Sequence, residues 1–245
     1  MSDNFESGIW QGSDYAKADH VSTYKQNLML RSGIFDEQFF LRDVGNNTGL
    51  NIDITHRCPM QCSRCQRQQY PLRAKEGVDV SLQTIEKLCD AFKSINFSGQ
   101  YSDPIHHPKF IDIMKMVYDK KVLAIIHNAS SSRSKNYYIK AFKANPYARW
   151  WFGIDGLPKD SHKYRVNQDG EKLFDIMLEA KKHLKLTPVW QYIIFKYNEN
   201  DIDTCRQMAR DNGLYFISLN SSKWTGDDDP LMPTKEEHKV WMQKW

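Results

Sequence analysis

The sequence of 245 residues lacks several features that mark other classes of protein. It has no run of about 18 apolar residues, which is the length a membrane-spanning helix needs. Its first eight residues show no basic start and no apolar stretch, so no secretory signal is expected. Internal repeats and low-complexity stretches are also absent. These absences favour a globular protein, which we expect to be cytoplasmic and to have no membrane partner.

Charge and cysteine content exclude two further classes. The formal net charge of +4 is mild for this length, and no basic stripe is evident, so a nucleic-acid partner is not expected. Five cysteines, three of them within eight residues, do not suggest a disulfide framework. Crowded thiols without a secretory signal are typical of metal binding in a reducing compartment.

From residue 49 onward, short apolar runs alternate with helix-length amphipathic runs. The strand-like runs are 50–55, 95–98, 122–127, 149–153, 189–195 and 215–219. The helix-like runs are 82–93, 109–120, 135–144, 171–184 and 202–212. Strands that alternate with helices predict an α/β fold with parallel strands, which we expect to form a partial (β/α)6 barrel.

Boundary signals divide the chain into three parts. Residues 1–48 are predicted to form an irregular extension, 49–220 the barrel, and 221–245 a C-terminal tail, and both ends are candidate covers for the barrel mouth. Within the barrel, Ser81 is predicted to cap a helix and Pro108 to lie in the first turn of the next. Gly213 is predicted to end the last helix.

The first strand alternates strictly between apolar and polar side chains. One face carries Leu50, Ile52 and Ile54, and the other carries Asn51, Asp53 and Thr55. Because helices cover the outside of such a barrel, the polar face is expected to line its interior. A polar interior predicts a chamber, and ligands of parallel α/β sheets bind where the strands end.

Three cysteines directly follow this strand, with the spacing Cys58-x3-Cys62-x2-Cys65. Three thiolates can hold three irons of a cubane cluster and leave the fourth iron open to bind a substrate or cofactor. A structural zinc site completed by His56 or His106 is the alternative. Such sites normally take paired cysteines and four ligands, and no second pair is present.

The two remaining cysteines fall on apolar helix faces. Cys89 lies with Leu82, Ile85 and Phe92, and Cys205 lies near Ile202. Both are predicted to be small core residues, so one cluster is expected.

The cysteine triplet after a first strand resembles the signature of the radical S-adenosylmethionine (SAM) enzymes. In that family the three cysteines hold a 4Fe–4S cluster, and the amino and carboxylate groups of SAM chelate the fourth iron. Reductive cleavage of SAM then yields methionine and a 5′-deoxyadenosyl radical that abstracts hydrogen from a substrate. The resemblance covers roughly residues 49–220.

Four further segments carry the resemblance. Gly99 to Pro104 resembles the family's glycine-rich segment, and 126–129 resembles the turn that ends its third strand. Residues 152–156, with His162 and Arg165, resemble a segment common in enzymes that act on peptides. Residues 190–199 resemble the fifth-strand region of those enzymes.

The resemblance implies a set of SAM contacts. They are Gly99, Gln100, Ser102, Asp103, Asn128, Asp155 and Arg165. The chain also departs from the family, because Arg64 stands where an aromatic residue usually precedes the last cysteine. Gln100 or Asp103 replaces a glutamate, Ser102 replaces a glycine, and Gly153 replaces a serine.

Several polar residues have two interpretations. Asp155 is predicted either to orient SAM or substrate or only to close a turn. Arg165 is predicted either to pair with the SAM carboxylate or to lie on the surface. Gln191 faces the chamber or pairs with backbone. His106 and His107 are ligands or, as we favour, cover a helix start. Residues 227–229 are predicted to form a solvated acidic loop.

The expected function is that of a radical SAM enzyme, sensitive to oxygen, that acts on a peptide or small molecule. The expected reductant is a flavodoxin or ferredoxin. The pattern is nearest to the peptide-modifying type, but no cysteine follows Cys205, so the cysteine-rich extension of that type is missing. No catalytic acid or base is identified. A nucleoside-directed or activase-like radical SAM protein, or a non-catalytic iron–sulfur or zinc protein, is the alternative.

Overall fold

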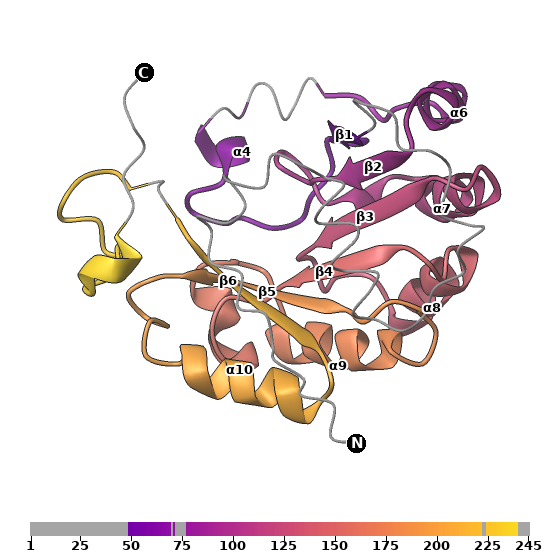
Figure 1. Ribbon diagram of the computed structural model, residues 1–245. Helices are drawn as coiled ribbons and strands as arrows, with labels where there is room; N and C mark the ends of the chain where they lie inside the picture. Colours follow the sequence, from indigo (N-terminus) through magenta and orange to yellow (C-terminus); the bar gives the residue numbers. More distant parts are fainter. Residues whose placement is uncertain (1–48, 70, 72–76, 222–223, 240–245) are drawn as a thin grey trace.

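One curved sheet of six parallel strands organises the molecule (Figure 1). The computed structural model describes residues 49–69, 71, 77–221 and 224–239, so the predicted extension 1–48 lies outside the described residues. The strands are β1 (Gly49–Ile52), β2 (Ser94–Phe97), β3 (Leu123–Asn128), β4 (Arg149–Gly153), β5 (Val189–Ile194) and β6 (Tyr215–Asn220). Each strand pairs in parallel with the next one in the chain. The predicted parallel α/β fold, a partial barrel, is confirmed.

Five helices return the chain between the strands and lie along one side of the sheet (Figure 1). They are α6 (Leu82–Ala91), α7 (Phe110–Asp119), α8 (Lys135–Ala144), α9 (Gly170–Ala180) and α10 (Ile202–Asp211). A short helix, α4 (Gln66–Gln69), follows the cysteines. The prediction of a helix over 171–184 was too long, because tight turns from Glu179 to Lys182 and from Ala180 to His183 end α9. Among the described residues, no helix is long and apolar enough to cross a membrane.

The predicted helix boundaries are confirmed at two positions and wrong at one. The Ser81 hydroxyl accepts a hydrogen bond from the Thr84 N–H at 3.1 Å, which caps α6. Gly213 ends α10 with φ +60°, a left-handed conformation that favours glycine. Pro108 precedes α7 rather than lying in its first turn.

His107 takes the capping role near the start of α7. Its Nδ1 accepts a hydrogen bond from the Lys109 N–H at 3.0 Å, and its Nε2 donates to the Val80 carbonyl at 2.9 Å. A short 3-10 helix, Pro104–His106, leads into this turn. His107 therefore covers a helix start, as the favoured interpretation had it.

The main hydrophobic core lies between the sheet and its helices. It contains Ile54, just after β1, and the outward-facing side chains of the strands, including Ile95, Phe97, Ile126, Phe152 and Trp190. Cys89 and Cys205 belong to this core, as predicted. Burial of each large apolar side chain contributes roughly 1.5–3 kcal/mol.

The inner face of the sheet is divided between two smaller apolar clusters. Trp151, Val189 and Ile217 form one of them, packed with Ile125 and Leu219. The other contains the cysteine loop and the ends of later strands. Along β3 the outward residues are buried, whereas Leu123, Ile125 and His127 are half-buried on the inner face. The alternation of faces is present along β3, but the prediction of a polar interior is wrong for this part of the sheet, because apolar side chains from β3 to β6 cover its inner face.

The C-terminal segment, residues 224–239, packs back against the site end of the barrel. The Asp229 carboxylate accepts hydrogen bonds from the Thr225 N–H, the Leu231 N–H and the Arg64 guanidinium. Asp227 and Asp228 are exposed, as predicted, but the prediction of a solvated loop is wrong for Asp229, which is 5% exposed. Its charge is satisfied internally, so it can be buried.

A second carboxylate holds the same segment. Glu199 accepts hydrogen bonds from the Thr234 N–H at 2.9 Å and the Lys235 N–H at 3.2 Å. The Lys196 N–H also donates to the Leu231 carbonyl at 2.9 Å. The segment therefore belongs to the folded unit rather than trailing from it.

We expect acid to release this segment. Burial alone would raise the pKa of Asp229 and of Glu199, but hydrogen bonds from Leu231, Thr225 and Thr234 outweigh it and lower each pKa below its ordinary value of 3.8 or 4.5. A carboxylate with a lowered pKa stabilises the fold at neutral pH and loses this contribution as pH falls through the folded value. The protection of residues 224–239 from hydrogen exchange, measured against the intrinsic exchange rate at each pH, should stay high from pH 7 to 5 and fall only below about pH 4. A loss of protection already between pH 7 and 5 would contradict the assignment.

Candidate functional site

The three cysteines lie in one apolar cluster at the end of β1. Cys62 is buried, and Cys58 and Cys65 are half-buried beside it. The cluster also contains Met60, Tyr164 and Phe195, and the Tyr164 and Phe195 rings lie 4.2 Å apart. Residues from loops far apart in the chain thus surround the thiols with apolar surface.

Burial keeps the free thiols of this cluster protonated. Burial raises the pKa of the Cys58 thiol to about 12 and that of Cys62 to about 11, although Arg165 opposes the shift at Cys62. Free thiols here are therefore neutral, whereas coordination to a metal deprotonates them and removes the penalty. Soft thiolates in an apolar setting fit an iron–sulfur cluster. Among the described residues no three His, Cys, Asp or Glu side chains converge on one metal position. A cluster does not require that, because each cysteine binds a different iron atom.

The Gly99–Pro104 loop, which follows β2, meets the cysteine loop. The Cys65 Sγ lies 3.8 Å from the Gln100 carbonyl oxygen. Gly99 has φ +61°, and a Cβ there would lie 2.9 Å from the Ser102 carbonyl oxygen, so the turn requires glycine. Asp53, at the end of β1, accepts a hydrogen bond from the Ser102 hydroxyl at 2.9 Å and from the Tyr101 N–H at 3.3 Å. Asp53 thus positions this loop, which was not predicted from the sequence.

Asp103 and Asn128 form a buried network behind the same loop. The Asp103 carboxylate accepts hydrogen bonds from the Asn128 side chain at 2.9 Å, the Ala129 N–H at 2.8 Å and the Ser130 N–H at 2.7 Å. The Asp103 N–H donates to the Arg57 carbonyl at 3.1 Å. This network joins the loops after β1, β2 and β3. A direct SAM contact by Asp103 or Asn128 stays a prediction.

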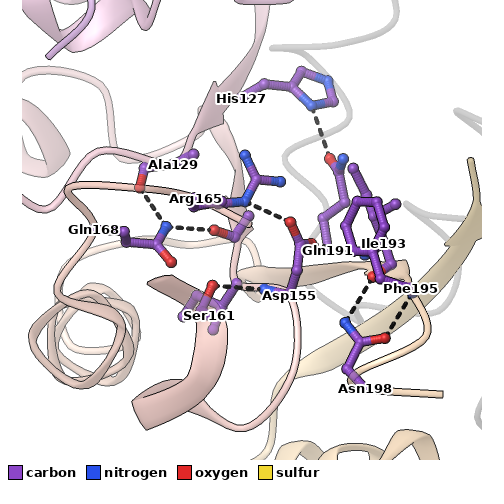
Figure 2. Close-up of polar contacts among 12 residues, drawn as sticks. His127, Ala129, Asp155, Ser161, Arg165, Gln168, Gln191, Ile193, Phe195 and Asn198 are labelled. Atoms are coloured by element: carbon purple, nitrogen blue, oxygen red, sulfur yellow. Dashed lines mark hydrogen bonds and ion pairs between the residues drawn. The ribbon is translucent and has the colours of Figure 1, made fainter. Parts of the chain in front are cut away.

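A buried ion pair lies in the segment after β4, and a hydrogen bond ties it to β5 (Figure 2). Arg165 Nε lies 2.7 Å from Asp155 Oδ2, and the Asp155 side chain is fully buried. Asp155 Oδ1 also accepts from the Ile193 N–H at 2.7 Å. Its own N–H donates to the Ser161 hydroxyl at 2.8 Å. The interpretation of Arg165 as a surface residue is wrong, because its side chain is only 11% exposed.

The guanidinium of Arg165 fills the space next to Gly153. A Cβ at Gly153 would lie 2.7 Å from Arg165 Nη2 and 2.8 Å from its Cζ. The serine that the family often has at this position would displace the guanidinium. The missing side chain at Gly153 therefore leaves the space that the buried Arg165 guanidinium occupies.

Replacing Gly153 with alanine should destabilise the fold by about 1–3 kcal/mol, because the methyl group overpacks against Arg165. The free energy of unfolding from urea titration measures this effect. In a double-mutant cycle, the same substitution should cost much less when Arg165 is already methionine. Equal costs in both backgrounds would show that the guanidinium is not the obstacle.

Two polar residues on the inner face, His127 and Gln191, form a hydrogen bond that was not predicted from the sequence. His127, at the end of β3, donates from Nδ1 to Gln191 Oε1 on β5 at 3.2 Å (Figure 2). Burial lowers the pKa of His127 to about 4, and the bond to Gln191 only partly opposes the shift, so the ring is neutral at pH 7. Gln191 therefore faces the interior. The spacing of His127 two residues after Ile125 on a strand was the signal that could have identified it.

Gln168 is another residue near the site that was not identified from the sequence. Its side-chain amide donates to the Gly153 carbonyl at 2.8 Å and to the Ala129 carbonyl at 2.5 Å (Figure 2). It thereby joins the loops after β3 and β4. His162, by contrast, is exposed and bonds to the Lys159 carbonyl, so the structure does not bring it to the site.

Arg64 fills the position where the family usually has an aromatic residue. Its guanidinium donates to Asp229 Oδ2 at 2.9 and 3.1 Å. Aromatic surface comes instead from Trp224 of the C-terminal segment, which packs on the cysteine cluster and contacts Phe195 edge to face at 6.2 Å. The C-terminal segment thus contributes to the wall of the site.

The fold agrees with that of solved radical SAM enzymes, such as the methyltransferase TsrM from Kitasatospora setae (TM-score 0.51), although sequence identity is only 10%. No protein-family model and no curated protein sequence matches the chain. SuiB from Streptococcus suis bound to SAM aligns with a TM-score of 0.59 and 10% identity over 76% of this chain and 43% of SuiB. Methylornithine synthase (PylB) aligns with a TM-score of 0.53 and 14% identity over 89% of this chain and 65% of that enzyme. The anSMEcpe enzyme with bound SAM and a Kp18Cys peptide aligns with a TM-score of 0.54 and 12% identity, over 79% and 55%.

The chain therefore has the fold of the radical SAM enzymes, which confirms the resemblance predicted from its motifs at the level of the fold. It spans less than half the length of SuiB and about two thirds that of PylB.

Proposed function

We propose that this protein is a radical SAM enzyme with one 4Fe–4S cluster on Cys58, Cys62 and Cys65. The observation that carries the proposal is the meeting of three loops where the strands end. The cysteine loop contacts the Gly99–Pro104 loop through Cys65 and Gln100, and Cys62 lies in the electrostatic field of Arg165. In a parallel α/β sheet this edge is where ligands bind.

Each part of the site has a role in this proposal. When bound, the cluster would supply the electron that cleaves SAM to methionine and a 5′-deoxyadenosyl radical. The backbone of Gly99 and Gln100 would receive the amino group of SAM. Arg165 would attract its carboxylate, because a guanidinium binds a carboxylate through two parallel hydrogen bonds. The Asp155 pairing fixes Arg165 before SAM arrives.

Apolar side chains around the thiols would exclude water and oxygen from the radical. Tyr164, Phe195 and Trp224 surround the cysteines from three segments of the chain. Exclusion of solvent strengthens electrostatic contacts and prevents side reactions of reactive species. None of the five cysteines is paired in a disulfide, which supports the proposed reducing cytoplasmic setting.

The substrate would enter the barrel interior, and we favour a peptide over a small molecule. SuiB was solved with its precursor peptide SuiA, and anSMEcpe with a Kp18Cys peptide. Here the interior offers the neutral pair His127 and Gln191, which can donate to and accept from peptide groups. A flavodoxin or ferredoxin would supply the electron.

Anaerobic reconstitution with iron and sulfide, followed by dithionite and SAM, tests the proposal. Chromatography should detect 5′-deoxyadenosine only when the cluster, the reductant and SAM are all present. A peptide substrate should raise its release above the rate without substrate. Full iron loading with no 5′-deoxyadenosine, or stoichiometric zinc in place of iron, would refute the proposal.

A further inference from the structure

A tight turn over residues 165–168 reaches from the segment after β4 to the cysteine loop. The Gln168 N–H donates to the Arg165 carbonyl at 2.8 Å, which closes the turn. Asn167 is its third residue and has φ +73°, a left-handed conformation that asparagine adopts more readily than most other non-glycine residues. Asparagine therefore suits the backbone of this turn and still offers a side-chain hydrogen-bond donor at its tip.

The tip of the turn holds the cysteine loop by two hydrogen bonds. The Asn167 side-chain amide donates to the Pro59 carbonyl at 3.1 Å. The Gln61 N–H donates to the Val166 carbonyl at 3.1 Å. These bonds lie on either side of Met60, which is 5% exposed and packs in the cysteine cluster. Both bonds therefore act within the short stretch between the first two cysteines.

Both ends of the turn are anchored in the interior of the protein (Figure 2). Arg165 pairs with the buried Asp155 at 2.7 Å. Gln168 is 6% exposed, and its side-chain amide donates to two backbone carbonyls. The cysteine loop, by contrast, contains no helix or strand from residue 53 to 65. The anchored turn therefore positions the cysteine loop, rather than the reverse.

The turn also begins with the arginine of the candidate site. Arg165 is its first residue, and Asn167 reaches the cysteine loop two residues later. Burial raises the pKa of Cys62 and the charge of Arg165 opposes that shift, so the guanidinium lies within electrostatic reach of this thiol. One short turn thus carries both the arginine and the contact that places the thiols next to it.

We propose that Asn167 is a positioning residue that sets the cluster-binding thiols against the arginine that binds SAM. The inference rests on the proposed function, in which the three cysteines hold the cluster and Arg165 binds the SAM carboxylate. SAM must meet both groups at once, so its affinity depends on the distance between the cysteine loop and the turn. Asn167 fixes that distance through its bond to Pro59.

Loss of this bond is expected to weaken SAM binding more than cluster binding. The three thiolates remain available for iron, but the cysteine loop then samples positions in which it no longer faces Arg165. The apparent affinity falls in proportion to the fraction of molecules that keep the binding geometry. One hydrogen bond shifts such an equilibrium by roughly two- to tenfold.

Two substitutions of Asn167 remove the donor in different ways. Asn167→Gly keeps a residue that accepts positive φ, and Asn167→Asp keeps the size of the side chain. In the reconstituted full chain, each should weaken SAM binding about fivefold, measured by titrating SAM against the electron paramagnetic resonance signal of the reduced cluster. Release of 5′-deoxyadenosine at saturating SAM should fall less than the affinity does.

Lys121→Gly is the matched control for these variants. Lys121 is the other non-glycine residue with positive φ in the described part of the chain, at +57°, and it lies in the turn after α7. The same kind of backbone change there should leave SAM affinity as it is in the unaltered protein. An equal loss of affinity in Lys121→Gly and Asn167→Gly would overturn the inference.

Hydrogen exchange of the cysteine loop is a second readout, which requires no activity. The Gln61 amide, bonded to the Val166 carbonyl, should exchange faster in both Asn167 variants and not in Lys121→Gly. Unchanged SAM affinity in both variants, or unchanged exchange at Gln61, would overturn the inference. If the unaltered protein with a full cluster binds no SAM, the proposed function fails instead, and exchange at Gln61 alone then decides whether Asn167 holds the loop.

Discussion

Replacing Cys62 with alanine is expected to abolish 5′-deoxyadenosine formation and to leave less than a full cluster after reconstitution. Cys62 is the most buried of the three thiols and lies between the other two in sequence. Two cysteines cannot hold three irons of a cubane, so the geometry that leaves one iron open is lost. Iron and sulfide content together with product release measure both effects.

Two cysteines of the same chain serve as controls for this experiment. Cys89→Ala and Cys205→Ala remove core thiols that are 6% and 0% exposed, on α6 and α10. Each should lower the free energy of unfolding by about 1 kcal/mol and leave cluster content and activity intact. A Cys62→Ala protein that keeps a complete, active cluster would contradict the assignment of the ligands.

Replacing Arg165 with methionine is expected to lower the free energy of unfolding by about 3–5 kcal/mol, because it leaves the buried Asp155 charge without its partner. Urea titration measures this loss. Affinity for SAM should fall as well, since the group proposed to bind its carboxylate is gone. The double variant Asp155→Asn/Arg165→Met separates these effects, because it should regain much of the stability without regaining SAM affinity.

The stability loss in Arg165→Met should depend on pH. Burial raises the pKa of Asp155, and Arg165 opposes that shift in the unaltered protein. Without the arginine, the folded-state pKa lies further above the ordinary value of 3.8. A carboxyl with a raised pKa costs stability at pH values above its unfolded pKa, so the loss should be largest near pH 7 and shrink as pH falls toward 4. A pH-independent loss would contradict the burial of an unpaired charge.

The sequence predicted those parts of the fold that depend on local pattern. Alternating apolar runs gave the six strands in order, and Ser81 and Gly213 marked helix ends because each acts within a few residues of itself. Burial of Cys89 and Cys205 followed from helical spacing alone. The position of the cysteines after the first strand predicted that they lie where the strands end, and the structure places them beside the end of β5.

The remaining features depend on contacts between residues far apart in the chain. Asp229 was expected in solvent, because nothing near it in sequence shows that Arg64, 165 residues earlier, neutralises it. The sequence showed only that Gly153 replaces a serine of the family, whereas the structure places the Arg165 guanidinium in the space that a side chain at residue 153 would need. His127 and Gln191 lie 64 residues apart, and only the curvature of the sheet brings them together. Local periodicity carries no information about such pairs.

If three cysteines hold a 4Fe–4S cluster, its fourth iron is open to SAM. Electron paramagnetic resonance of the reconstituted, dithionite-reduced protein, recorded with and without SAM, detects such binding. We expect a reduced-cluster signal whose g values shift when SAM is added, and no such signal in Cys62→Ala. A complete cluster whose spectrum is unchanged by saturating SAM would contradict this expectation.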